Sequence, residues 1–417
     1  MRKIFVAVNC IPVDVEPAVQ KFWNELDRAL KKSGSALLVL TTANFIYSET
    51  QSIRVPYLLT DFKKIKTTVS AGTTPSAPLV DDIKKWYGLS QEDALETFGA
   101  VHGFFASLFD RVRPAGFIGW QSVNPMTRIA RACALEQDVP FWAAERGWLP
   151  RTIMFDQREN NYLSELRTSF PLQKLQRSYV PSSTISQAVK LRFGSQPASG
   201  RYKEADHLPS RPFREKYGIP EDVKLYAYFP HGEPSINSLG QTTLAQAHDG
   251  TQEELTRNFA ELRGELLRRG AWLVVQEHPF NRGSVGTVDI GSDSRVIKVN
   301  EAIRSVIDAA DHFIFTLSTI QFQVAIAKKS FGLLCKSALY RPDTVPLASN
   351  FSAIDYFVDA IENESEWTAR FEKIERFICF LYEYVLHDLD SAELNCSVEI
   401  VANHLLSLSS SSENIKD

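Results

Sequence analysis

Short apolar runs alternate with helical patterns in two successive series along this chain of 417 residues. The first series has apolar runs at 4–8, 36–40, 117–120 and 139–144, with helical spacing at 19–30, 104–112 and 127–135. The second has runs at 224–229, 272–275, 295–299, 312–315 and 331–335, with helical spacing at 255–266, 302–310 and 320–328. Such alternation predicts a parallel sheet with helices on both faces. We therefore expect an α/β protein with two doubly wound, Rossmann-like halves.

Clusters of proline, glycine and serine between residues 163 and 215 interrupt the alternation and predict loops. We place the connection between domains there, which gives an N-terminal domain at 1–200 and a C-terminal domain at 201–380. Helical patterns continue at 367–386 and 393–408, and the last residues are polar. We expect the segment 381–417 to form a C-terminal helix and a frayed tail that packs back on the N-terminal domain.

The balance of charges and the cysteines narrow the class of protein. The chain has 46 Lys and Arg against 50 Asp and Glu, a net charge of −4, which does not favour a nucleic-acid partner. Its five cysteines are scattered and odd in number, so we expect reduced thiols, a cytoplasmic protein and no metal site. No run reaches the roughly 18 apolar residues of a membrane helix, so any membrane contact is expected to be peripheral.

Polar segments follow five of the apolar runs. In a doubly wound protein such segments emerge at the carboxyl ends of strands, where ligands bind, and we expect the two halves to bring them together across a cleft. The five segments begin at Gln121, Glu145, Pro230, Glu277 and Thr316.

Several residues in these segments suit the chemistry of a phosphorylated sugar donor. Ser318 and Thr319 precede a helix, where they either bind an anion or merely cap that helix. His278, with Arg282 nearby, either binds phosphate or is structural. Glu145 and Glu233 are carboxylates of the kind that glycosyl transfer uses, although each is also compatible with an ordinary surface charge.

Several common motifs are missing from the sequence. It has no GxxxxGK[ST] loop, no GxGxxG after the first strand and no GxSxG elbow, which disfavours P-loop, simple dinucleotide-binding and α/β-hydrolase proteins. An obvious Asp-x-Asp motif for a metal-bound diphosphate is also missing. We therefore expect metal-independent transfer.

The segment Glu145-x-Gly147-x-Leu149-Pro150-x-Thr152, followed by Asp156 and Asn161, resembles the E-x-G-x-L-P-x-T…D…N signature of the bacterial capsule-synthesis superfamily. Three other places agree with it. Residues 117–121 are similar to the family's strand that ends in Trp-Asn, His278-Pro279 resembles its His-Pro turn, and Ser318-Thr319 with Ala325 and Lys329 resembles its phosphate-binding helix. This superfamily includes retaining β-Kdo transferases of the GT-B fold, which use CMP-Kdo to build capsule linkers and lipopolysaccharide O-antigens.

The resemblance implies a role for each matching residue. Glu233 would be the nucleophile, and Glu145 would assist proton transfer or hold the acceptor. His278 would be a third catalytic residue. The resemblance also implies that the donor and the acceptor are bound by two separate sets of residues. The donor set is His231, Arg282, Ser318, Thr319, Lys329 and Tyr340, and the acceptor set is Gln121, Arg146, Trp148, Asp156 and Asn161. The family's lipid-linked acceptors imply work at the inner face of the membrane.

The sequence departs from the family's pattern at several positions. Gln121 stands for Asn, Gln323 for Glu, and Lys328-Lys329-Ser330 for Gly-Lys-Pro, while Glu233 stands where the family has Asp. A longer carboxylate at position 233 shifts the attacking oxygen, so the donor and the stereochemical course stay open. Two alternatives therefore remain beside CMP-Kdo transfer. The first is a GT-B enzyme with a UDP-, GDP- or phosphoribosyl-type donor, and the second is a non-catalytic assembly protein.

Overall fold

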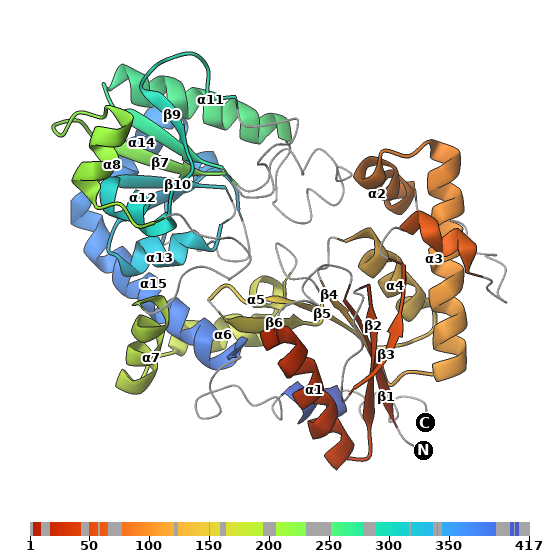
Figure 1. Ribbon diagram of the computed structural model, residues 1–417. Helices are drawn as coiled ribbons and strands as arrows, with labels where there is room; N and C mark the ends of the chain where they lie inside the picture. The colour runs from red at the N-terminus through yellow and green to blue at the C-terminus, as the bar shows by residue number, and fades with distance from the viewer. Residues whose placement is uncertain are drawn as a thin grey trace. The chain divides into compact units, whose positions relative to one another are not determined.

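The protein was examined as a computed structural model, which contains two compact units (Figure 1). Unit 1 comprises residues 1–170 and 382–417, and unit 2 comprises residues 171–381. The structure describes residues 3–9, 17–42, 50–56, 59–65, 77–120, 124–149, 151–158, 164–194, 206–230, 252–277, 289–316, 318–336, 340, 344–388, 401–403 and 405–407.

Unit 1 is built on a seven-stranded sheet with the strand order β12-β6-β5-β4-β1-β2-β3. The strands are β1 (Ile4–Asn9), β2 (Ala36–Thr41), β3 (Gln51–Arg54), β4 (Gly116–Trp120), β5 (Phe141–Arg146), β6 (Thr152–Asp156) and β12 (Leu386–Asp388). The first five strands are parallel, while β6 and β12 add to the sheet as antiparallel strands. This order gives a Rossmann-like sheet in which β1 is the middle one of five parallel strands, with an antiparallel extension on one side.

Helices cover both faces of this sheet. They are α1 (Pro17–Lys32), the 3₁₀ helix η2 (Leu59–Lys64), α2 (Ala77–Tyr87), α3 (Gln91–Val112), α4 (Pro125–Glu136) and α5 (Glu165–Thr168). Successive residues of β4 point to opposite faces, so Phe117 packs with α3 and α4 while Ile118 packs with Trp23 of α1. All five residues of β4 are buried, as expected for a strand with helices on both sides.

The C-terminal segment completes unit 1. Strand β12 pairs antiparallel with β6, and Val401, Ala402 and Leu405 join the core cluster that contains Trp23. The end of the chain therefore belongs to the same unit as its beginning, as Figure 1 shows by the blue segments beside α1.

Unit 2 contains a second, fully parallel sheet with the order β11-β10-β7-β8-β9. Its strands are β7 (Leu225–Phe229), β8 (Trp272–Gln276), β9 (Val296–Val299), β10 (His312–Phe315) and β11 (Ser330–Leu333). Its helices include α7 (Ser183–Gly194), α8 (Ser210–Tyr217), α11 (Gln252–Arg268), α12 (Ile303–Ala309), α13 (Ile320–Ile326), the 3₁₀ helix η4 (Ala348–Asn350) and α14 (Ile354–Glu362). Two further helices, α6 (Phe170–Ser178) and α15 (Glu364–Tyr384), contain the points where the chain passes between units.

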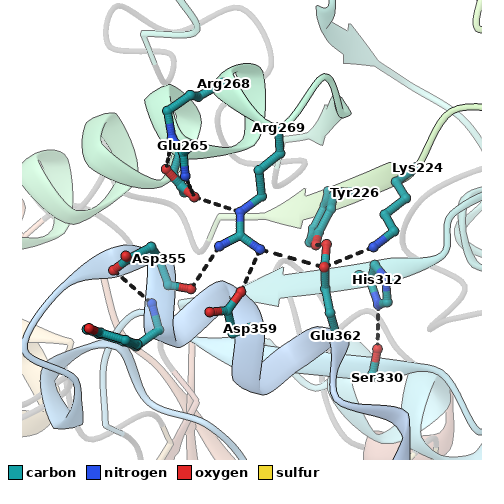
Figure 2. A network of polar contacts seen from close by, with 11 residues as sticks. Lys224, Tyr226, Glu265, Arg268, Arg269, His312, Ser330, Asp355, Asp359 and Glu362 are labelled. Atoms are coloured by element: carbon teal, nitrogen blue, oxygen red, sulfur yellow. Dashed lines mark hydrogen bonds and ion pairs between the residues drawn. The ribbon is translucent and has the colours of Figure 1, made fainter.

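A network of polar contacts fastens α11 and α14 to the sheet of unit 2 (Figure 2). The buried Tyr226 of β7 donates its hydroxyl hydrogen bond to Glu362 at 2.5 Å, and Lys224 forms an ion pair with the same carboxylate at 2.9 Å. Arg269, just after α11, contacts Glu265 at 2.6 Å and Asp359 of α14 at 2.7 Å. Burial raises the pKa of Glu362, but the hydrogen bonds from Tyr226 and Lys224 outweigh it and keep that pKa below its usual value. These ion pairs and hydrogen bonds therefore hold α11 and α14 against the sheet of unit 2.

The predicted α/β class with two doubly wound sheets is confirmed. The stretch 163–215 contains the helices α5, α6, α7 and α8, with chain outside helices and strands at 179–182 and 206–209, and the chain passes between the units within this stretch, as predicted. The division between the units falls at residue 170, thirty residues before the predicted 200. The physical reason is that α7 packs within unit 2, where its Lys190 forms an ion pair with Glu375 of α15 at 2.9 Å. Among the described residues, no helix has the length and hydropathy needed to span a membrane.

Candidate functional site

The sheet of unit 2 has a topological switch point between β7 and β10. The chain proceeds from β7 to β8 and β9 on one side, and then crosses to β10 and β11 on the other. Phe229 and Phe315 are register partners at the ends of these two strands, so the segments that follow them begin side by side. Open α/β sheets bind ligands at this kind of position. The first segment carries His231 and Glu233, which lie outside the described residues, and the second carries Ser318 and Thr319.

Ser318 and Thr319 have different surroundings. The Ser318 hydroxyl accepts a hydrogen bond from the Ile320 N–H at 3.3 Å, and its carbonyl accepts one from the Gln321 side chain at 2.8 Å. Thr319 is exposed, and its hydroxyl makes no capping hydrogen bond to α13. Ser318 therefore helps to start the helix, as the simpler sequence interpretation allowed, while the Thr319 hydroxyl is available to a ligand.

A cavity of about 270 Å³ lies near this switch point in unit 2. Its lining includes Arg257 of α11, Lys336 and Cys335 after β11, and the residues before α14. The Cys335 thiol donates a hydrogen bond to the Thr316 carbonyl at 3.3 Å, which connects the cavity wall to the segment after β10. The lining carries the carboxylates Glu254 and Glu261 as well as the cations Arg257 and Lys336, so its charges balance.

The structure does not bring Lys329 together with Ser318 and Thr319. Lys329 lies at the far end of α13, just before β11, and its ammonium group donates to the Ala310 carbonyl at 2.9 Å. Helix α13 runs antiparallel to the strands and so returns the chain to the amino edge of the sheet. The grouping of these three residues as one phosphate site is therefore wrong in this geometry. Tyr340 is buried, and its hydroxyl accepts a hydrogen bond from the Asn350 side chain at 2.7 Å.

Unit 1 has its own switch point, between β1 and β4. These two strands are neighbours in register, with Val8 beside Gly119, and the crossovers from them lead to opposite sides of the sheet. Gln121 follows β4 directly but lies outside the described residues. The segment ends at Asn124, whose side chain accepts a hydrogen bond from the Met126 N–H at 2.9 Å and so caps α4.

Glu145 lies at the same carboxyl edge, but within a strand. The apolar run at 139–144 predicts a strand, and the observed strand β5 extends two residues further to Arg146; β5 and β6 pair antiparallel as a hairpin, with Glu145 beside Met154. In the register of β5 with β4, Ala144 lies beside Trp120, so Glu145 extends one residue beyond the end of β4. The Glu145 carboxylate is partly exposed and accepts a hydrogen bond from the Arg146 N–H at 3.1 Å. A carboxylate is thus held on a strand, one residue beyond the end of β4.

Asp156 holds the chain segment that follows the hairpin. Its carboxylate accepts hydrogen bonds from the Arg158 N–H at 2.8 Å, the Ser164 hydroxyl at 2.6 Å and the Glu165 N–H at 2.8 Å. Asp156 pairs with Ala143, which places it on the same face of the hairpin as Glu145. These contacts give Asp156 a structural role, and its proposed contact with an acceptor remains a prediction.

Sequence analysis missed Glu165, which adds a second carboxyl group beside Asp156. Burial raises the pKa of Glu165, and the negative charge of Asp156 raises it further. The sequence signal for this position was Ser164, because serine is a common N-cap residue and Glu165 follows it in the first turn of the short helix α5.

The other described residues of the signature make packing contacts and hydrogen bonds around the turn between β5 and β6. Gly147 approaches Thr152 closely, the Thr152 hydroxyl donates to the Leu149 carbonyl at 2.7 Å, and Leu149 is buried. Trp148 is only 8% exposed, so its ring packs in the core instead of offering an open stacking face. Arg146 is partly buried on the face of the sheet opposite Glu145. Of the remaining predicted site residues, Asn161, His278 and Arg282 lie outside the described residues.

No protein-family model and no curated protein sequence matches the chain. Among solved structures, the KpsC β-Kdo 2,4-transferase of Thermosulfurimonas dismutans is 15% identical, with 70% of this chain and 87% of that chain covered and a TM-score of 0.47. The KpsC β-Kdo 2,7-transferase of the same organism is 13% identical, with 80% and 97% covered and a TM-score of 0.40.

The UDP-GlcNAc 2-epimerase of Methanocaldococcus jannaschii, solved with UDP-GlcNAc and UDP, is 12% identical, with 92% of this chain and 99% of that chain covered. Its TM-score is 0.39. All three scores lie below 0.5, so the function of this chain has to be argued from its own residues.

Proposed function

We propose that this protein is a glycosyltransferase of the GT-B type that transfers Kdo, an acidic sugar, from CMP-Kdo to a glycan acceptor of a bacterial surface polysaccharide. The observation that carries the proposal is the presence of two Rossmann-like sheets, each with polar segments at the carboxyl edge of its switch point. The resemblance of residues 145–161 to the capsule-synthesis signature supports Kdo as the sugar.

In this proposal unit 2 binds the donor. Thr319, His231 and Arg282 contact the phosphate and the sugar carboxylate, and the cavity beside Arg257 and Lys336 receives the nucleotide. The Glu233 carboxylate attacks the anomeric carbon as CMP leaves, and the acceptor hydroxyl then displaces Glu233, which results in retention. We propose transfer without a metal cofactor, because the sequence has no obvious Asp-x-Asp motif for a metal-bound diphosphate.

Unit 1 presents the acceptor in this proposal. Glu145 takes the proton of the attacking hydroxyl, a task that suits a partly exposed carboxylate fixed on a strand. The acceptor is a lipid-linked glycan, and the protein works at the inner face of the membrane through peripheral contact.

The donor is tested first by a thermal-shift panel of CMP, UMP, UDP, GDP and ADP, which requires no acceptor. A ligand at 100 times its dissociation constant stabilises the folded state by about 2.7 kcal/mol. We expect a rise in Tm with CMP alone. A rise with UDP or GDP would replace the donor in the proposal, and no rise with any of the five would favour a non-catalytic assembly protein.

Catalysis is tested with Glu145→Gln and Glu233→Gln in an assay of Kdo transfer. We expect Glu145→Gln to lower the rate by about 10² to 10⁴-fold, the usual contribution of a positioned base. Glu233→Gln loses the attacking carboxylate and should lower the rate at least as much. The matched control is Glu92→Gln, an exposed position in the first turn of α3, which should keep its activity. Full activity in both Glu145→Gln and Glu233→Gln would contradict the assigned roles.

A further inference from the structure

Three side chains that can bind a metal meet between α3 and α4 in unit 1. They are His102 of α3 and Cys133 and Glu136 of α4, and their ligand atoms all lie within 4.8 Å of one another. The His102 Nε2 lies 2.9 Å from a Glu136 carboxylate oxygen. Cys133 and Glu136 are three residues apart, which places them on the same face of α4 toward His102. The group therefore joins two helices, and His102 and Cys133 are 31 residues apart in sequence.

The donor set is one nitrogen, one sulfur and one oxygen, and each of the three is a ligand type that Zn²⁺ takes in proteins. With Zn–N near ~2.0 Å and Zn–S near ~2.3 Å, a tetrahedral ion holds its ligand atoms roughly 3 to 4 Å apart. Small rotations of the side chains would bring the three ligand atoms to that spacing. Three protein ligands leave one position for water, and the Glu136 side chain is 43% exposed, so an ion has access from solvent.

The His102 ring lies between the two helices with its Nε2 toward Glu136. Its side chain is 4% exposed, and Nε2 is the ring nitrogen that would hold an ion shared with the Glu136 carboxylate. Without an ion, the ring is held on its polar side by Glu136, and the Cys133 thiol donates a hydrogen bond to the His102 carbonyl at 3.6 Å. The ligand atoms of all three side chains therefore already lie close together.

We propose that His102, Cys133 and Glu136 bind a Zn²⁺ ion that fastens α3 to α4. Coordination releases the thiol proton of Cys133 to solvent, so that thiolate, imidazole and carboxylate face the ion. Cys133 and Glu136 lie in the last turn of α4, whereas the switch-point segment of unit 1 enters at its first turn. The ion therefore lies at the end of α4 away from the switch point, and the proposal is independent of the proposed transfer reaction.

The test uses the full-length protein, stripped with a chelator and titrated with Zn²⁺ or Co²⁺. We expect one zinc per chain by elemental analysis, a rise in Tm with zinc, and a thiolate-to-cobalt charge-transfer band in the near ultraviolet. Cys133→Ser should abolish the band, whereas Cys379→Ser, which alters another buried free cysteine, should keep it.

Glu136→Gln is a second test in case Cys133→Ser fails to fold, because the Glu136 side chain is largely at the surface. Its apparent Kd for zinc should rise by more than the roughly 10- to 100-fold that loss of an outer-shell partner costs. The proposal is overturned if the wild-type protein binds no stoichiometric zinc and shows no cobalt band, or if Cys133→Ser retains the band. An unchanged zinc affinity in Glu136→Gln would also overturn it.

Discussion

A Cβ atom on Gly147 would lie 2.0 Å from the Oγ1 of Thr152 and 3.0 Å from Leu386 of β12. The tight turn also includes a hydrogen bond from the Gly147 N–H to the Thr152 carbonyl at 2.7 Å. This contact explains why the signature contains a glycine and a threonine at this spacing. It holds the hairpin on which Glu145 is placed.

Gly147→Ala should therefore destabilise the protein by about 1 to 3 kcal/mol, the usual cost of overpacking. Urea unfolding of the variant measures this. Gly264→Ala is the matched control, because a Cβ there meets nothing within 4 Å and lies inside helix α11. The control should be neutral or more stable by about 0.5 to 1 kcal/mol. Equal stability of Gly147→Ala and wild type would show that the turn is looser than described.

Asp156→Ala should lower stability by about 1 to 3 kcal/mol, because the Ser164 hydroxyl and two backbone N–H groups lose their acceptor. Asp156→Asn retains one carbonyl oxygen and should lose less. The measurement is chemical denaturation alongside the KM for the acceptor. A variant with wild-type stability and a raised KM would instead indicate that Asp156 mainly contacts the acceptor.

Thr319→Ala and Ser318→Ala should separate donor binding from helix capping. Ser318→Ala should cost about 0.5 to 1 kcal/mol of stability, since its hydroxyl accepts from the Ile320 N–H. Thr319→Ala should keep the stability of the free protein and weaken CMP binding by roughly 10-fold, the loss of one hydrogen bond to a charged group. Calorimetric titration with CMP measures the second effect. Equal CMP affinity in Thr319→Ala and wild type would remove Thr319 from the donor site.

The carboxylate of Glu265 should make stability depend on pH in the acid range. Hydrogen bonds from Arg268 and Arg269 (Figure 2) lower the pKa of Glu265 from 4.5 to about 2. Because the pKa in the folded state is the lower one, the stabilisation is fully present above about pH 4.5 and is lost as the pH falls toward 2.

Glu265→Gln should be less stable at pH 6 and should lose less stability between pH 4.5 and pH 2 than the wild type. Glu261→Gln, an exposed position on the same helix, is the control and should follow the wild-type profile. Thermal unfolding at a series of pH values gives both curves. If the stability of Glu265→Gln and that of the wild type changed with pH in the same way, the lowered pKa of Glu265 would be contradicted.

The sequence by itself determined the two α/β sheets, because the apolar runs of their central strands are buried on both faces and leave a continuous signal. It also placed Ser318 and Thr319 at a strand end, and the structure puts that end beside β7. The short strand β3 gave no such signal, since three of its four residues are exposed.

Only the tertiary structure decided which contacts each signature residue makes. Asp156 and Ser164 are eight residues apart, and Gly147 contacts Leu386 from the far end of the chain. The meeting of His102 with Cys133 and Glu136 likewise depends on the packing of two helices. Local periodicity encodes which face of an element is apolar, whereas contacts between distant segments follow from the order in which the strands join a sheet.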